Sequence, residues 1–198
     1  MTIMSPISTN PWPMLQDWLS DARASGVPDP LPMAFITVGV DGRPSARMVG
    51  LKLVREETLI FSSALWTRKA RELTTNPSVS LLFYWPELGR QIHIAGRAQI
   101  AERGLSEELF AARPLAHRLQ SIVSHQGDRI EDLEVLRRRH AHLMSVLESD
   151  PQCPEDWGAV RVTPQALEFW QQATDRMHDR LLFVVDDEGG WSRQRLAP

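Results

Sequence analysis

Residues 176–180 read RMHDR and follow the run EFWQ at residues 168–171, and these two stretches decide how the rest of the chain is interpreted. The region is apolar and strand-like, yet two arginines and a histidine interrupt it. Residues i, i+2 and i+4 of a strand share one face, so the sequence predicts that Arg176, His178 and Arg180 point the same way. Three potential cations on one face favour a planar or phosphorylated anion, and a solvated strand face is the alternative.

The two stretches resemble the C-terminal signature of the pyridoxine/pyridoxamine 5′-phosphate oxidase family, which ends in RLAP, as residues 195–198 do here. Met177 stands where the family has leucine. The resemblance covers residues 32–198. It implies a fold that is mainly β with peripheral helices, namely an FMN-binding split β-barrel that forms a homodimer.

Composition places the chain among ordinary globular proteins. It has 198 residues, 42% of them hydrophobic, which favours one well-buried domain. A net charge of −3 gives no reason to expect nucleic acid or an anionic membrane as a partner. The single cysteine, Cys153, fits a reducing compartment. Residues 1–26 lack the features of a targeting segment, so a cytoplasmic location is expected.

The hydrophobic pattern predicts an N-terminal helix and an extended connector over residues 1–31, followed by one domain over residues 32–198 with a helical insertion around residues 104–149. Strands are expected at residues 33–40, 45–54, 58–63, 79–85, 90–100, 159–162, 166–171, 178–185 and 191–196. Helices are expected at residues 67–75, 105–112, 115–123 and 129–147. Hairpin succession with inserted helices favours an antiparallel barrel.

A phosphate site is predicted where a helix begins after Ser62 and Ser63. Thr67 is expected to cap that helix, and Arg68 and Lys69 lie in its first turn, where backbone amides and cations attract anions. A capped surface helix that begins with basic residues is the alternative. The family resemblance assigns Arg68 and Lys69 to the FMN phosphate.

The resemblance also assigns the remaining FMN contacts. Residues 47–52, RMVGLK, resemble a family motif that binds FMN and substrate, and Gly50 replaces a usual aliphatic residue. Gln91 inherits a contact with the edge of the flavin ring. Gln126 inherits another, although Gly127 replaces a usual serine. The full expected FMN set is Arg47, Met48, Val49, Lys52, Ser62, Ser63, Arg68, Lys69, Gln91, Gln126, Trp170 and Arg180.

The resemblance implies that substrate is held by Lys52, Arg113, His117, Arg176 and His178. Family members that act on vitamin B6 hold the substrate phosphate with a tyrosine and a serine as well, and here those positions are Leu109 and His117. Each lost hydrogen bond to a charged group costs about 1.5–3 kcal/mol. The two replacements therefore leave the substrate open.

The sequence thus predicts an FMN-dependent oxidase that converts pyridoxamine or pyridoxine 5′-phosphate to pyridoxal 5′-phosphate with O₂ as acceptor. Arg176 and His178 would steer the substrate over the flavin. Two alternatives remain: an oxidase of another aromatic substrate, of the phenazine-biosynthesis type, and a non-catalytic protein that binds flavin or B6 phosphate. No metal site is expected, because His140 and His142 face different ways on a helix.

Overall fold

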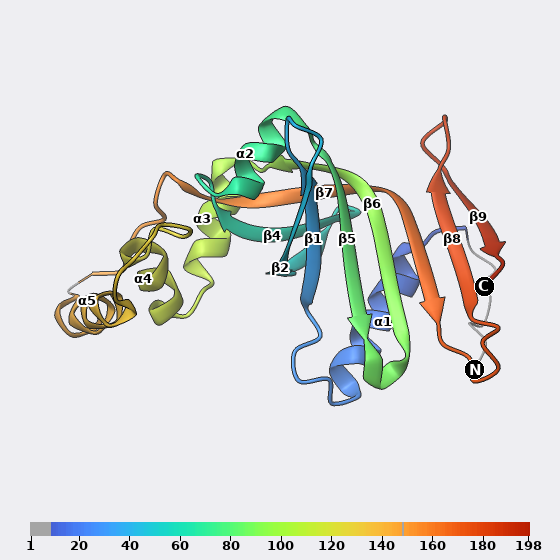
Figure 1. Cartoon of the computed structure of the whole chain (residues 1–198), viewed down its shortest axis with the longest axis horizontal. Coiled ribbons are helices and arrows are strands. Elements are labelled where there is room, and N and C mark those ends of the chain that lie inside the picture. The colour runs from blue at the N-terminus through green and yellow to red at the C-terminus, as the bar shows by residue number, and fades with distance from the viewer. Residues whose placement is uncertain (1–8, 148) are drawn as a thin grey trace.

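A long, strongly curled antiparallel sheet forms the body of the protein in the computed structural model, which describes residues 9–147 and 149–198 (Figure 1). The order along the sheet is β2-β1-β5-β6-β7-β4-β3, and β8 and β9 extend it from β7. The strands are β1 (Pro32–Val38), β2 (Pro44–Gly50), β3 (Leu53–Arg55), β4 (Thr58–Ala64), β5 (Ser78–Trp85), β6 (Arg90–Ile100), β7 (Trp157–Gln171), β8 (Asp179–Val185) and β9 (Trp191–Leu196). The expected split-barrel architecture, mainly β with peripheral helices, is confirmed.

Strand β7 connects the two ends of the sheet. One of its edges pairs with β6, while its other edge pairs first with β4 and then with β8. Two separate strands were predicted here, at residues 159–162 and 166–171, and that prediction was wrong. The strand continues through Pro164, which lacks a backbone N–H, because the register with β6 shifts between Ala95 and Gly96.

The predicted strand over residues 45–54 is also incorrect, because it is divided. β2 leaves its partner β1 at Gly50, and the Lys52 amide then donates to the Ile60 carbonyl of β4 at 2.8 Å. The chain therefore passes from the β2 edge of the sheet to the β3–β4 edge between Arg47 and Lys52. This crossing places the two cations in different surroundings.

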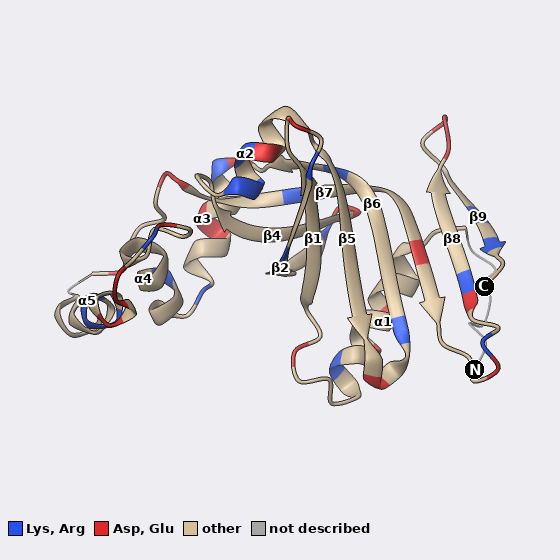
Figure 2. Ribbon diagram, viewed as in Figure 1, with Lys and Arg blue, Asp and Glu red and all other residues tan. Residues whose placement is uncertain are grey.

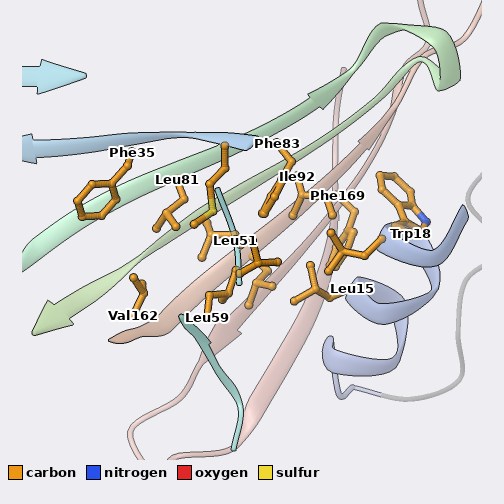
Figure 3. Packing of buried hydrophobic residues seen from close by; sticks show 14 of the residues in the cluster. Leu15, Trp18, Phe35, Leu51, Leu59, Leu81, Phe83, Ile92, Val162 and Phe169 are labelled. Atoms are coloured by element: carbon orange, nitrogen blue, oxygen red, sulfur yellow. The ribbon is translucent and has the colours of Figure 1, made fainter. Parts of the chain in front are cut away.

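Helix α1 (Trp12–Ala24) closes the concave side of the sheet. Asn10 Oδ1 accepts a hydrogen bond from the Trp12 amide at 2.9 Å, which satisfies a backbone donor at the start of the helix. Leu15 and Trp18 lie on its buried face, and the Trp18 ring meets Phe169 of β7 edge to face at 5.2 Å (Figure 3). Residues 1–8 of the expected N-terminal segment lie outside the described residues.

The remaining helices are α2 (Arg68–Thr75), α3 (Arg103–Ala111), α4 (Leu115–Val123) and α5 (Leu133–Val146), with a short 3₁₀ turn, η1 (Pro86–Leu88). α5 begins later than the predicted residue 129 because Asp132 is its N-cap and accepts from the Glu134 amide at 2.8 Å. α4 and α5 lie together, away from the main sheet (Figure 1). Within residues 9–147 and 149–198, no helix has the length and apolar character needed to cross a bilayer.

Candidate functional site

A cluster of charged side chains lies where α2 covers β1 and β2. Arg47 of β2 is directly opposite Phe35 of β1, and Ser45 is opposite Thr37, so their side chains share the inner face of the sheet. Arg47 Nη1 donates to the Phe35 carbonyl at 3.0 Å and to Thr37 Oγ1 at 2.7 Å. Its Nη2 donates to Ser45 Oγ at 2.6 Å. The guanidinium is therefore fixed by three neighbours.

Glu72 of α2 is the buried anion of this cluster, with a side chain that is 8% exposed. Its carboxylate accepts hydrogen bonds from Thr37 Oγ1 at 2.5 Å, Ser45 Oγ at 2.8 Å and Arg68 Nε at 2.6 Å. Removal from water favours the neutral acid, but these hydrogen bonds and the Arg68 charge outweigh that effect and lower the pKa of Glu72 to about 2. Glu72 is therefore ionised at neutral pH.

The low pKa of Glu72 predicts a specific acid sensitivity. A carboxylate with a depressed folded-state pKa stabilises the fold above its unfolded-state pKa, near 4.3, and loses that contribution as the pH falls through about 2. From pH 5 to pH 2 the free energy of unfolding of the wild type should fall by about 2.5 kcal/mol more than that of Glu72→Gln. Urea titrations of both proteins at the two pH values measure this difference. Parallel losses would show that Glu72 titrates normally.

Lys69 lies beside this cluster and is only 7% exposed. Burial lowers its pKa, and the nearby Arg47 charge lowers it further. Within the described part of the chain, the ammonium has no hydrogen-bond or ion-pair partner. Arg47, Arg68 and Lys69 against Glu72 leave the cluster with a formal charge of +2. A phosphate monoester, which carries about −1.5 to −2 at neutral pH, fits both the charge and the unpaired donor.

The hydroxyl groups next to α2 differ in whether they are accessible to a ligand. Ser63 is buried, and its hydroxyl donates to the Ala64 carbonyl at 3.0 Å. Thr67 occupies the predicted N-cap position, but its hydroxyl donates to the same carbonyl at 2.7 Å and makes no cap hydrogen bond with the helix. The prediction of a side-chain cap was therefore wrong. Only Ser62 is partly open, and it lines the cavities described next.

A cavity of about 480 Å³ opens between the β2–β4 region and the start of α4. It brings together three of the predicted substrate residues with the altered position Leu109. Its lining is Gly50, Lys52, Leu53, Ser62, Glu108, Leu109, Ala112, Arg113, Pro114 and His117. The residue placements match a site for an anionic ligand with an apolar part, because cations and leucines face the same space.

Arg113 stands between this cavity and a smaller one of about 110 Å³ that also includes Ser121, Ser124 and Gln126. Its Nη1 donates to Ser121 Oγ at 2.5 Å, and its guanidinium carbon lies 5.2 Å from the Trp157 ring centre. Burial lowers the pKa of Arg113, although the group stays a cation. Ser121 was missed by sequence reasoning, but its spacing of one helical turn from His117 is the signal that places it on this side of α4.

A clamp of aromatic rings holds the loop that carries Gln126. The Trp66 and His125 rings stack with centres 4.0 Å apart and planes 9° apart, and Trp66 Nε1 donates to the Gln126 carbonyl at 3.0 Å. Gly127 has φ 101°, a conformation that L side chains rarely adopt. The glycine in place of the expected serine is therefore required by the backbone of this loop.

At the opposite end of the sheet, Gln91, Trp170 and Arg180 lie in direct register on β6, β7 and β8. Their neighbours Ile92, Phe169 and Leu181 are in the core, so these three side chains share the outer face. Arg180 Nε donates to Glu168 at 2.7 Å, and its Nη1 donates to the Ala197 carbonyl at 3.1 Å.

His178 lies against Trp170, with ring centres 4.8 Å apart. Its Nδ1 accepts a hydrogen bond from the Ala173 amide at 3.1 Å. A neutral imidazole that accepts at Nδ1 carries its proton on Nε2. The hydrogen bond from the Ala173 amide therefore leaves Nε2 as the donor atom of the His178 ring.

The prediction that Arg176, His178 and Arg180 share one strand face was wrong. β8 begins at Asp179, so only Arg180 belongs to a strand. Arg176 lies in a turn with φ 66°, and Asp175 Oδ1 accepts from the Met177 amide at 3.0 Å, which stabilises that turn. The turn breaks the alternation on which the prediction depended.

The predicted flavin contacts thus form two separate groups within one folded subunit. Ser62 is opposite Ala159 of β7, and Gln91 is opposite Trp170 of the same strand. Eleven residues of strand separate these positions, a path of about 36 Å along the curled strand at 3.3 Å per residue. Figure 2 shows charged positions on α2 at one end and on β8 and β9 at the other. Met48 of β2 is 62% exposed on the outer face, and Val49 packs against the core.

Comparisons with known proteins identify the family of the chain. A family model described as pyridoxamine 5′-phosphate oxidase matches residues 19–146, and one described as the pyridoxine 5′-phosphate oxidase C-terminal dimerisation region matches residues 157–198. The chain is 40% identical over 191 residues to a pyridoxine/pyridoxamine 5′-phosphate oxidase of Burkholderia vietnamiensis, covering 96% of this chain and 89% of the relative. It is 41% identical over 181 residues to the same enzyme of Chromobacterium violaceum, covering 91% and 85%.

Among solved structures, the chain is similar to PhzG from Burkholderia lata in complex with tetrahydrophenazine-1-carboxylic acid. The TM-score is 0.91 at 33% identity, over 97% of this chain and 94% of the other. An FMN-binding protein of Nostoc punctiforme shares the fold with a TM-score of 0.79 at 18% identity, over 97% and 100%. From these matches and the phosphate-compatible cluster, we conclude that the chain belongs to the pyridoxamine 5′-phosphate oxidase family of FMN-dependent oxidoreductases.

Proposed function

We propose that the protein oxidises pyridoxamine or pyridoxine 5′-phosphate to pyridoxal 5′-phosphate and uses O₂ as the electron acceptor. The observation that carries this proposal is the cavity of about 480 Å³, where Lys52, Arg113 and His117 face one space. Two permanent cations and an imidazole suit a phosphate monoester. The aliphatic wall formed by Leu53 and Leu109 suits the ring of the same substrate.

The proposal places FMN between two copies of the chain. Arg47, Arg68 and Lys69 of one subunit hold its phosphate, while Gln91, Trp170 and Arg180 of the second subunit border its ring. The two groups lie on opposite faces of the sheet, Arg47 on the inner face beside Phe35 and the other group on the outer face, and this supports the sharing of FMN between subunits. Exposed Met48 and Tyr84 on the outer sheet face, together with the match to a dimerisation region, support a homodimer.

FMN, when bound, would supply the redox chemistry of hydride removal from the substrate and reoxidation by O₂. The chain's own residues orient and hold the substrate. Lys52 and Arg113 of one subunit bind the phosphate, and His178 of the second subunit, which lies against Trp170, donates from Nε2 toward the substrate ring. Arg176 is exposed in the turn that precedes His178, and we propose that its cation also contacts the substrate. This positioning raises the rate by fixing the reacting carbon against the flavin.

An oxidase of a reduced phenazine carboxylate is the second candidate. The similarity to PhzG favours it, and so does the cavity wall. Leu109 is apolar where a hydroxyl would help to bind phosphate, and a methyl group at Gly50 would meet only Lys52 Nζ at 3.7 Å. A carboxylate needs fewer donors than a phosphate, and a wider aromatic ring system fills more of the apolar wall.

One experiment separates the two candidates. The FMN-loaded protein is mixed anaerobically with pyridoxamine phosphate, pyridoxine phosphate or a dihydrophenazine carboxylate, and loss of the oxidised flavin absorbance is followed. Rapid bleaching by either B6 phosphate, with pyridoxal phosphate as product, supports the proposal. Bleaching by the phenazine alone would reject it in favour of the second candidate, and bleaching by none would favour a binding protein.

The altered cavity predicts a gain of function. The double change Leu109→Tyr and His117→Ser introduces two hydroxyl donors at the cavity wall. We expect kcat/KM for pyridoxine phosphate to rise about tenfold or more, because each hydrogen bond to a charged group contributes about 1.5–3 kcal/mol. Steady-state kinetics at neutral pH measures this. His142→Ser, the same change on the exposed face of α5, is the control. An unchanged or lower kcat/KM in the double variant would count against a B6 phosphate.

A further inference from the structure

We propose that Glu72 is a positioning residue that fixes how Arg47 and Arg68 present themselves to the flavin phosphate. The inference rests on the proposed placement of FMN. Glu72 itself contacts no ligand in this scheme. Its carboxylate, 8% exposed, acts through two hydroxyls, through Arg68 Nε and through a direct ion pair with Arg47 Nη2 at 3.7 Å.

The first part of the argument is the direction of the hydrogen bonds. Glu72 is ionised and can only accept, so Thr37 and Ser45 must both donate their single hydroxyl hydrogen to Oε2. Each oxygen then has only lone pairs to offer to other groups. Arg47 takes these lone pairs, with Nη1 on Thr37 and Nη2 on Ser45. The Glu72 carboxylate thus sets the donor–acceptor direction of the hydrogen bonds that run from Arg47 through Thr37 and Ser45, which we call the relay.

The second part concerns Arg68. Its Nε donates to Glu72 Oε1 at 2.6 Å, one helical turn away, and this is the side of the guanidinium that faces the cluster. No described residue accepts a hydrogen bond from its two terminal nitrogens. Its side chain is 59% exposed and would otherwise sample many rotamers. The contact with Glu72 fixes the arginine while it leaves both terminal nitrogens for a ligand.

A competing effect gives this inference a sharp test. A carboxylate close to a bound phosphate repels it, so Coulomb's law alone requires that removal of the charge should tighten FMN binding. A positioning role requires the opposite. The glutamine of Glu72→Gln has one acceptor oxygen and one NH₂ group, so it cannot accept from Arg68 and from both hydroxyls together. Either Arg68 or the pair of hydroxyls that orients Arg47 then loses a hydrogen-bond acceptor at residue 72.

The experiment measures dissociation constants of the apo protein for FMN and for riboflavin, which lacks the phosphate, by quenching of flavin fluorescence. We expect Glu72→Gln and Thr37→Val to weaken FMN binding about 10- to 100-fold each, with riboflavin affinity nearly unchanged. Thr37→Val keeps the charge of the cluster constant and so isolates the relay. The controls are Glu107→Gln on the exposed face of α3 and Thr74→Val at the surface of α2.

Each outcome is decisive. Tighter or unchanged FMN binding by Glu72→Gln overturns the inference, and so does an equal loss of FMN and riboflavin, which indicates general support of the fold. Thermal unfolding of each apo variant identifies a folding failure, and in that case Thr37→Val decides alone. Normal FMN binding by Lys69→Met would instead show that the phosphate lies elsewhere, and the proposed placement of FMN would fail. If Lys69→Met loses FMN while Glu72→Gln and Thr37→Val keep it, only the role of Glu72 is refuted.

Discussion

Replacing Lys69 with methionine is expected to raise the dissociation constant for FMN about 10- to 100-fold without lowering the stability of the apo protein. The loss follows from one hydrogen bond between two charged groups, worth about 1.5–3 kcal/mol. The stability follows from the sign of the pKa change. A lysine whose pKa is lowered by folding, here by burial and then by Arg47, opposes folding at neutral pH. Methionine removes that cost and keeps the packing volume.

Flavin fluorescence titration and urea unfolding of the apo variant measure the two halves of this prediction. Arg71→Met on the exposed side of the same helix is the matched control, and it should change neither quantity appreciably. A variant that loses stability and FMN together would mean that Lys69 is a structural residue. Weaker FMN binding together with unchanged or higher stability would identify Lys69 as a residue that binds the ligand and destabilises the fold.

Mixed dimers should recover FMN sites that neither parent has. A protein with Lys69→Met lacks the phosphate end of both sites, and one with Trp170→Ala lacks the ring end of both. In a mixed dimer, one site combines the two defects and the other combines the two intact ends. Random assembly makes half of the dimers mixed, so about a quarter of the wild-type FMN content should return.

Co-expression of the two variants with different affinity tags isolates the mixed dimers directly, and FMN content per dimer is read from absorbance. One FMN per mixed dimer is the expected result, with little in either parent. Mixed dimers as empty as their parents would mean that each site is built within a single subunit. Full loading of the Trp170→Ala parent would mean that the second group does not border the ring.

The sequence predicted most elements because their local signals were strong. Leu15 and Trp18 recur at helical spacing, and the predicted α1 is present with both side chains buried. The strand at residues 191–196 was also predicted correctly. The break predicted at Pro164 was wrong because a proline normally ends a strand, whereas here it occupies a shift in register whose partner, Gly96, lies far away in sequence.

The site was harder to predict, since its chemistry depends on contacts between distant residues. The cavity residues Lys52, Arg113 and His117 were assembled from the family resemblance, and the structure does bring them together. Nothing local indicated that Glu72 is buried, because its partner Thr37 is 35 residues away. The burial of Lys69 was equally hidden, because a lysine in the first turn of a helix is usually solvated.

The unbroken course of β7 has a consequence for a dimer with shared sites. In the proposed dimer each subunit would contribute the phosphate end of one site and the ring end of the other, and β7 runs from Trp170 to its pairing with β4, the strand that precedes α2. The curvature of β7 is set where Gly96 approaches so closely that a Cβ would lie 2.3 Å from the Thr163 carbonyl oxygen. In the proposed dimer, a change in that bend would alter the spacing within both sites at once. A substitution at Gly96 is therefore expected to disturb the two flavin sites together.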